Sequence, residues 1–278
     1  VEDYFSRLNT ALTRGKAVCR IGVIHPIESY WLRFGPEEHT GEERKQREAN
    51  FQSLPEWLLY GHLDFDFICE SLLPAQCALG SAPLKVGQME YDVVLVPDCI
   101  TLRSETVERL EAFAAAGGRL VFAGKVPDHV DAKPSRRVLN LAAGAINVQY
   151  NRTDIVNALE PARDVEVISR KTGMRAQELV YQMRQDGKGR WFFLCHGSNP
   201  ANADVPYADE LEIRLKGIWN IKQYDAVTGE IIDVQVSHRT GTTMIGKTFW
   251  PHDSLLLRLE PCGSHEITAD VQVSTPHF

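Results

Sequence analysis

Two short apolar segments constrain the fold of this chain more than any other feature. The first is the run Val93-Val94-Leu95-Val96, and the second is the run Arg119-Leu120-Val121-Phe122-Ala123. Continuous apolar runs bounded by turn residues are typical of strands that are buried on both faces of a parallel sheet. Between them, Ser104 to Ala116 carries apolar residues at helical spacing, and two parallel strands need such a crossover, in a right-handed sense. The segment therefore predicts a βαβ unit.

The rest of the sequence divides into two parts. Before about Pro161, strand-like runs alternate with amphipathic helical segments, which predicts an α/β domain with a parallel sheet and flanking helices. From Val165 onward, short runs without helical periodicity alternate with turn signals such as Asp186-Gly187, which is typical of an antiparallel β-sandwich. These runs cover residues 178–185, 190–196, 211–215, 220–224, 231–237, 243–250 and 254–259. For 278 residues we expect two domains, at 1–162 and 163–278.

Charge and composition exclude several classes of function. A net charge of −7 argues against nucleic-acid binding, which needs clustered Lys and Arg. No apolar run reaches the roughly 20 residues that span a bilayer, and no signal peptide is expected. The six cysteines form no C-x-x-C pair, so we expect reduced thiols, no metal site and a cytoplasmic protein. Because residue 1 is Val rather than Met, the chain is expected to be cut from a longer one.

The predicted sheet lacks the motifs of a cofactor or nucleophile site. No G-x-G-x-x-G or G-x-x-x-x-G-K-[ST] sequence is present, so no cofactor is expected. An amidotransferase-like or hydrolase-like enzyme would carry its nucleophile in the turn after a strand. The turn Gly124-Lys125-Val126-Pro127 contains neither Cys nor Ser, and Cys99 has no His and carboxylate pair nearby in sequence. We therefore expect no catalytic residue, with an enzyme that uses Cys99 as the alternative.

Two acidic and aromatic segments could face a substrate or a partner. Aromatic rings stack on sugar faces while carboxylates accept hydrogen bonds from hydroxyl groups, and paired carboxylates perform glycoside hydrolysis. The alternatives are ordinary loop packing and a solvated acidic strand end. The candidate residues are His25, Glu28, Tyr30 and Trp31 in the first segment and Asp64, Asp66 and Glu70 in the second.

The order of the motifs resembles a known family. The motifs are Leu63-Asp64-Phe65-Asp66-Phe67-Ile68, Tyr91-Asp92-Val93-Val94-Leu95-Val96-Pro97 and Phe113-Ala114-Ala115-Ala116-Gly117-Gly118-Arg119-Leu120-Val121. Together they resemble the trimerisation domain of family 42 β-galactosidases, which is similar to class I glutamine amidotransferases without their nucleophile. The resemblance implies a flavodoxin- or amidotransferase-like parallel sheet with flanking helices. The stretch His25-Pro26-Ile27-Glu28-Ser29-Tyr30-Trp31 and the later Tyr224-Asp225-Ala226-Val227-Thr228-Gly229 resemble rhamnosidase-like bacterial glycoside hydrolases, in which a β-sandwich follows.

The resemblance implies a function and partners. It implies a C-terminal, non-catalytic part of a bacterial glycoside hydrolase, which assists oligomerisation or lines the mouth of the active site. The implied partners are a catalytic barrel of the same parent chain, further copies in a homo-oligomer and a carbohydrate ligand. A carbohydrate-binding module that uses Tyr30 and Trp31 is a further alternative.

Overall fold

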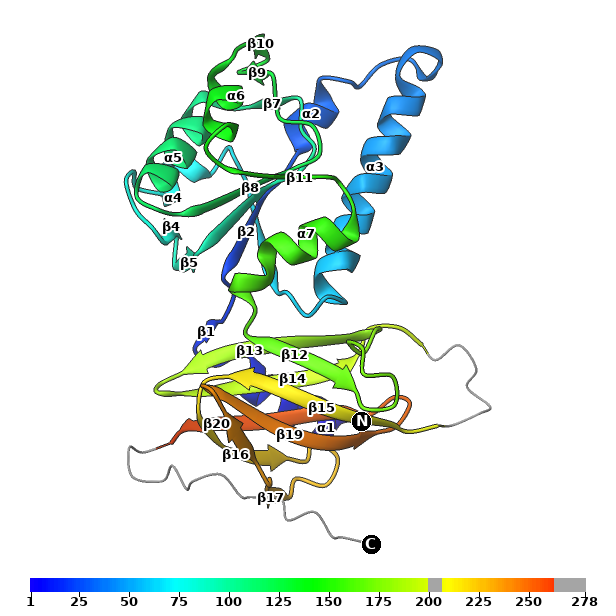
Figure 1. The fold of residues 1–278 in the computed structure, drawn as a ribbon. Coiled ribbons are helices and arrows are strands. Elements are labelled where there is room, and N and C mark those ends of the chain that lie inside the picture. Colours follow the sequence, from blue (N-terminus) through cyan, green and yellow to red (C-terminus); the bar gives the residue numbers. More distant parts are fainter. Residues whose placement is uncertain (200–206, 263–278) are drawn as a thin grey trace, which may run out of the picture.

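The computed structural model describes residues 1–199 and 207–262. Figure 1 shows an α/β part above a β-sandwich, and the chain starts in the sandwich before it enters the parallel sheet. Within the described ranges no helix is both long and apolar enough to cross a membrane.

Five parallel strands form the central sheet of the α/β part. Their order is β11-β8-β6-β2-β3, which in chain order is the flavodoxin-like arrangement 2-1-3-4-5. The predicted fold class is therefore confirmed. The strands are β2 (Ile21–Ile24), β3 (Phe65–Ile68), β6 (Val93–Val96), β8 (Arg119–Ala123) and β11 (Ile146–Val148).

Helices cover both faces of this sheet, as Figure 1 shows. On β6, Val94 and Val96 pack against the helices α4 (Leu73–Gln76), α5 (Ser104–Ala115) and α6 (Arg137–Ala142). Val93 and Leu95 point to the opposite face, towards α3 (Glu37–Leu59) and α7 (Arg152–Leu159). Burial on both faces explains why β6 is a continuous apolar run rather than an alternating one.

The long helix α3 differs from the expectation. The sequence pattern predicts a helix from Glu42 to Gly61 with a kink or a break at Pro55, whereas α3 begins at Glu37 and continues through Pro55. Leu54 and Leu58 anchor this part of the helix in the core, with 1% and 0% exposure. Packing on the sheet therefore outweighs the one backbone hydrogen bond that proline cannot make.

Two antiparallel sheets form the predicted sandwich, and their apolar faces enclose one core. Each predicted run overlaps a strand, although the run at 231–237 reaches two strands that belong to different sheets. One sheet has the order β1 (Lys16–Ala17), β13 (Leu179–Asp186), β14 (Gly189–His196), β20 (Ser254–Pro261), β16 (Trp219–Tyr224) and β17 (Ile231–Asp233). The other has the order β12 (Val165–Ser169), β15 (Asp209–Lys216), β19 (Thr242–Phe249) and β18 (Ser237–Arg239).

The first helix belongs with the sandwich. In α1 (Glu2–Leu12), Leu8 and Ala11 pack against Leu256 and Ala226, and β1 pairs with β13. The sequence predicts two domains, at 1–162 and 163–278. We propose that residues 1–17 belong to the second of these, because they pack and pair with the sandwich. The remaining short elements are α2 (Ile27–Trp31), β4 (Leu84–Val86), β5 (Met89–Tyr91), β7 (Thr101–Leu102), β9 (His129–Val130), β10 (Lys133–Pro134) and η1 (Glu160–Ala162).

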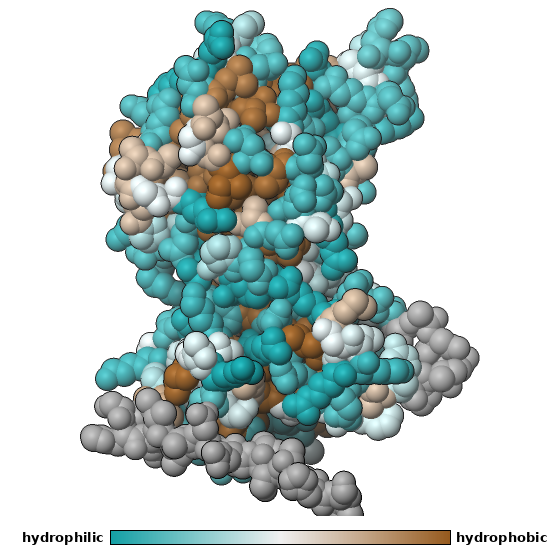
Figure 2. Space-filling model, in the orientation of Figure 1, coloured by the Kyte–Doolittle hydropathy of each residue, from teal (hydrophilic) through white to brown (hydrophobic). Residues whose placement is uncertain are grey.

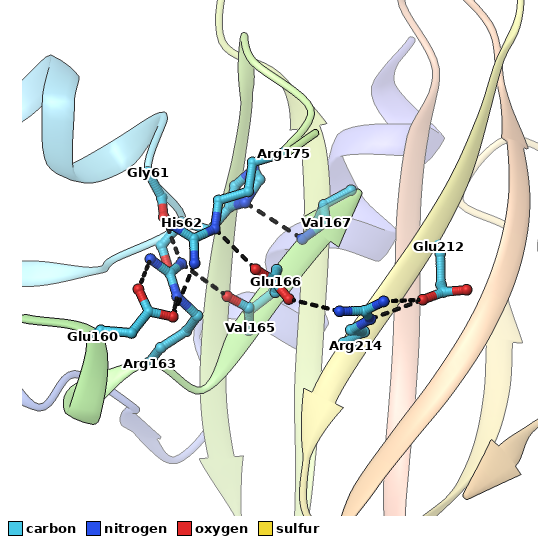
Figure 3. A network of polar contacts seen from close by, with 10 residues as sticks. All are labelled: Gly61, His62, Glu160, Arg163, Val165, Glu166, Val167, Arg175, Glu212 and Arg214. Carbon is cyan, nitrogen blue, oxygen red and sulfur yellow. Dashed lines mark hydrogen bonds and ion pairs between the residues drawn. The ribbon is translucent and has the colours of Figure 1, made fainter. Parts of the chain in front are cut away.

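Arg163 connects the two parts of the molecule where the chain leaves α7 for β12. Its Nη1 donates to the carbonyl oxygens of Gly61 and His62, the latter at 3.0 Å, and its Nε donates to Glu160 Oε1 at 2.7 Å. Figure 3 shows this guanidinium between the turn after α3 and the start of the sandwich. Since only 8% of the Arg163 side chain is exposed, these contacts are shielded from water.

The same junction contains a buried histidine and further ion pairs. His62 is fully buried, and its Nδ1 accepts a hydrogen bond from the Val167 N–H at 3.4 Å. Burial lowers the pKa of His62 to about 3, and the neighbouring arginines add to the effect, so the ring is neutral at pH 7. Glu166 accepts from Arg175 at 2.9 Å and from Arg214 at 3.1 Å. Figure 2 shows mainly hydrophilic residues over this waist, which fits a junction held by polar contacts.

Candidate functional site

The order of the parallel strands indicates where a ligand would bind. The first strand, β2, lies between β3 and β6, so the chain connections leave β2 and β6 in opposite directions. In open α/β sheets this switch point opens a crevice at the carboxyl ends of the two strands. His25 directly follows β2, and Pro97 and Asp98 directly follow β6. The crevice is therefore bounded by these residues.

A cavity of about 210 Å³ lies at this switch point. The elements that enclose it are the end of β2, α2, the end of β6, α3 and the residue Tyr150, which precedes α7. We call it the switch-point cavity. Its lining residues are His25, Pro26, Ile27, Tyr30, Arg47, Glu48, Asn50, Phe51, Leu54, Pro97, Asp98 and Tyr150.

His25 lies between two aromatic rings at one wall of the cavity. Its ring centroid is 5.2 Å from that of Phe51 and 5.4 Å from that of Phe67, both edge-to-face. Partial burial lowers the pKa of His25, so the imidazole is neutral at pH 7. A neutral imidazole can donate through one nitrogen and accept through the other. His25 can therefore offer a polar group within an apolar wall.

Asp98 provides one of the two carboxylates of the cavity, and residues of α3 hold it in place. Asn50 Nδ2 donates to Asp98 Oδ2 at 3.4 Å, and Arg47 Nη1 lies 4.0 Å from the same oxygen. Arg47 also pairs with Glu43 at 3.0 Å, so its charge is shared between two carboxylates. The hydroxyl of Tyr150 donates to the Asn50 carbonyl oxygen at 2.8 Å. These contacts fix the polar side of the cavity.

The position where an amidotransferase-like nucleophile would lie is a glycine. Gly124 follows β8 with φ +83°, and a Cβ atom there would lie 3.1 Å from Tyr150 Cβ and 3.2 Å from Asp98 Cβ. A side chain at this position would therefore strain the backbone and crowd both neighbours. Cys99 is 1% exposed, and burial raises the pKa of its thiol well above the usual range. A neutral, buried thiol is a poor nucleophile.

Glu28, Glu70 and Trp31 lie outside the switch-point cavity. Glu28 forms an ion pair with Arg103, and Glu70 is buried beside the start of α5, with 3% exposure. Trp31 lies beside Glu28 in a shallow neighbouring depression and is 61% exposed. Burial raises the pKa of Glu70 to about 7. These side chains form a second group next to the cavity.

Asp64 lies at the opposite end of β3 from His25, and Asp66 lies within β3, opposite Gly22 of β2. Asp64 precedes β3, and its backbone N–H donates to the Tyr181 hydroxyl on the sandwich strand β13 at 3.4 Å. Asp66 accepts from the Tyr91 hydroxyl at 3.0 Å. Burial raises the pKa of Asp64 to about 6. Asp64 therefore lies at the domain junction, whereas Tyr91, the partner of Asp66, lies within the α/β part.

The structure thus brings together only two of the predicted residues, His25 and Tyr30, at the cavity. Sequence reasoning missed Asp98, Phe51 and Tyr150. Asp98 carried a signal, since it directly follows a buried strand, but the approach of α3 and of Tyr150 depends on tertiary packing. Among the residues that the structure describes, no group of three or more His, Cys, Asp or Glu side chains could hold a metal ion.

Comparisons with known proteins place this fold among glycoside hydrolase structures. No protein-family model matches the sequence, and no curated protein matches it by sequence. A rhamnosidase from Novosphingobium sp. PP1Y superposes with a TM-score of 0.64 and 16% identity over 97% of this chain and 25% of that one. A GH42 β-galactosidase from G. stearothermophilus superposes with a TM-score of 0.54 and 10% identity over 88% of this chain and 40% of that one. An exo-carrageenase GH42 from Bacteroides ovatus superposes with a TM-score of 0.51 and 11% identity over 87% of this chain and 29% of that one.

These similarities confirm the expected resemblance at the level of the fold. The chain spans between a quarter and two fifths of the length of these three structures. In each, the alignment covers both the α/β part and the sandwich, since nearly nine tenths or more of the chain is matched. The chain therefore has the two-part fold that forms a portion of these larger glycoside hydrolase structures.

Proposed function

We propose that this chain is a non-catalytic accessory portion of a larger glycoside hydrolase. In this proposal it acts beside a catalytic barrel of the same parent chain, in a reducing, cytoplasmic environment. The observation that carries the proposal is the fold, which matches a portion of a rhamnosidase and of GH42 enzymes rather than a whole chain. The buried thiols Cys19, Cys77 and Cys99 support a reducing compartment.

Neither of the two positions considered for an amidotransferase-like nucleophile carries a usable side chain, which supports the non-catalytic assignment. Gly124 occupies the turn after β8, and Cys99 is buried and neutral. Asp64 and Glu70, the carboxylates with raised pKa values, lie at opposite ends of β3 and cannot act as a pair on one glycosidic bond. An enzyme that uses Cys99 is therefore disfavoured.

An exposed apolar segment supports a role in assembly. Trp31, Leu32 and Phe34 lie at the end of α2 and just after it, and they are 61%, 44% and 71% exposed. Clusters of large exposed apolar side chains mark surfaces that contact other proteins or domains. We propose that this segment contacts the catalytic domain or another copy in a homo-oligomer.

An assay of the purified chain tests the proposal. The chain is incubated with a panel of aryl glycosides and, separately, with glutamine, and a known glycosidase serves as the positive control. We expect no release of aglycone or ammonia above the buffer rate. Release of sugar that Asp64→Asn or Glu70→Gln abolishes would contradict the non-catalytic assignment, and ammonia release that Cys99→Ala abolishes would support the alternative enzyme.

A further inference from the structure

We infer that the switch-point cavity binds one neutral sugar ring. The inference rests on the proposed function for the choice of carbohydrate as the ligand, whereas the site itself follows from the strand order, the cavity and its side chains. Such a site would let the accessory portion hold a unit of the glycan, or a released sugar, away from the catalytic barrel.

The walls of the cavity suit the apolar face of a sugar ring. Phe51 forms one wall, Ile27 and Leu54 extend it, and Pro97 lies at the end of β6. Phe51 is held in place because its ring stacks on Phe67 at a centroid distance of 5.3 Å and an angle of 29°. The C–H face of a pyranose packs on such rings, while its hydroxyl groups point to the edges. A volume of about 210 Å³ fits a single small ring rather than an oligosaccharide.

The polar groups of the cavity have hydrogen-bonding capacity to spare. Among the described residues, the structure gives no partner to the Tyr30 hydroxyl, to the ring nitrogens of His25 or to Asp98 Oδ1. A carboxylate accepts, a phenol donates or accepts, and a neutral imidazole does both. Sugar hydroxyl groups both donate and accept, so each of these groups could be satisfied by a neutral polyol. Polar groups that lack a partner in a concave site are the ones that determine ligand orientation.

The charges around the cavity favour a neutral ligand over an anion. Asp98 and Glu48 contribute two carboxylates, and Arg47 is the one cation among the lining residues. The guanidinium of Arg47 already contacts Glu43 through two nitrogens and lies near Asp98. An anionic sugar or a phosphate would therefore meet net negative charge without a free cation.

Titration of the whole chain tests the inference. Isothermal calorimetry and ¹H–¹⁵N NMR would use methyl glycosides of neutral hexoses and 6-deoxyhexoses, with a hexuronic acid and inorganic phosphate as charged probes. We expect saturable binding of at least one neutral sugar, with amide shifts that centre on His25, Tyr30 and Asp98. The hexuronic acid should bind at least about tenfold more weakly than its neutral counterpart, since repulsion of about 1.4 kcal/mol gives that ratio.

Variants locate the site. Phe51→Ala removes the apolar wall and Asp98→Ala removes the acceptor, and each should raise the Kd by about tenfold or more. Phe5→Ala is the matched control, because this aromatic residue is 61% exposed on α1 in the sandwich part, and it should change the Kd less than about twofold. If a variant does not fold, the shifts in the unmodified chain still decide where the sugar binds.

Three results would overturn the inference: no saturable binding of any neutral sugar, tighter binding of the uronate or phosphate, or shifts that centre on Trp31 rather than on His25. A chain that neither binds nor hydrolyses sugars would remove this inference and leave the proposed accessory function in place. A chain that hydrolyses aryl glycosides would remove the proposed function whatever the cavity binds.

Discussion

The carboxylate of Glu70 accepts a hydrogen bond from the backbone N–H of Arg103 at 2.8 Å. Glu70 lies just after β3, and Arg103 precedes the first residue of α5. An acceptor at the start of a helix satisfies a backbone donor that has no partner within the helix. The Arg103 side chain in turn pairs with Glu28. Two carboxylates that the sequence suggested as substrate-facing thus connect α2 and the end of β3 to α5.

Deprotonation of Glu70 should lower the free energy of unfolding as the pH rises. Burial raises its pKa from 4.5 to about 7, so between these values the folded state holds a proton that the unfolded state has released. The free energy of unfolding therefore falls with rising pH across this window, by up to about 3 kcal/mol. Glu70→Gln keeps an acceptor and does not titrate, so urea unfolding at pH 5 and pH 8 should give a smaller difference in the variant. The pKa of Asp64 is raised as well. Asp64 is present in both proteins, so its contribution to the pH dependence cancels when the variant is compared with the unmodified chain. An equal difference in both proteins would show that Glu70 does not titrate in this range.

Arg163 should be the side chain on which the domain junction most depends. Arg163→Ala leaves the carbonyl oxygens of Gly61 and His62 without this donor, and it leaves the Glu160 carboxylate with Arg175 alone. Loss of a shielded, charged donor is expected to cost about 2–4 kcal/mol. Urea unfolding should show this loss, and limited proteolysis should show faster cleavage near the junction. Arg214→Ala is the control, since its side chain is 41% exposed and the loss should stay below about 1 kcal/mol. Equal losses in both variants would contradict the assigned role.

Cys69, rather than Cys99, should be the reactive thiol of the folded chain. Cys69 is exposed, and a hydrogen bond with the Ser71 hydroxyl is the main cause that lowers its pKa. Cys99 donates its S–H to the Pro97 carbonyl oxygen at 2.8 Å and is buried. Titration with a chromogenic disulfide at pH 7.5 should show a fast phase that Cys69→Ser removes and Cys99→Ser leaves intact. A fast phase that disappears in Cys99→Ser would revive the enzyme alternative.

Gly124 should tolerate a side chain less well than Gly117 does. Both have positive φ, +83° and +87°, but a Cβ at Gly124 meets Tyr150 and Asp98 whereas a Cβ at Gly117 meets nothing within 4 Å. Gly117→Ala therefore isolates the backbone strain, about 1–2 kcal/mol. Gly124→Ala should cost at least about 1 kcal/mol more, because neighbouring side chains must also move. Thermal unfolding of the two variants measures the difference, and equal costs would mean that the turn can accept a side chain.

Much of the fold could be predicted from the sequence because burial leaves a local pattern. The run Val93–Val96 is apolar throughout since helices cover both faces of β6, and the sandwich strands alternate since one face of each sheet is solvated. The helix predicted at Asn151–Leu159 is α7, where the Asn151 side chain accepts from the Asp154 N–H as an N-cap. Short elements such as α6 and β11 left no comparable pattern and were not predicted.

The candidate site could be predicted only in part, because its residues come from separate segments. His25 and Tyr30 follow β2 and were found as an aromatic and polar stretch at a strand end. Phe51 joins them because α3 crosses the carboxyl edge of the sheet, and Tyr150 joins because it precedes α7. Local periodicity in the sequence predicts neither the position of Phe51 nor that of Tyr150 at the cavity. The separation of Asp64 from His25 likewise depends on the direction of β3, whose amino end faces the sandwich.

The most direct test of the proposed accessory function is the encoded sequence that precedes Val1 in the parent reading frame. We predict a segment of alternating strands and helices in the pattern of a (β/α)₈ barrel, with two carboxylates at the carboxyl ends of its strands. A start codon immediately before Val1, or an upstream segment with no such pattern, would contradict the proposal that this chain is the accessory portion of a glycoside hydrolase.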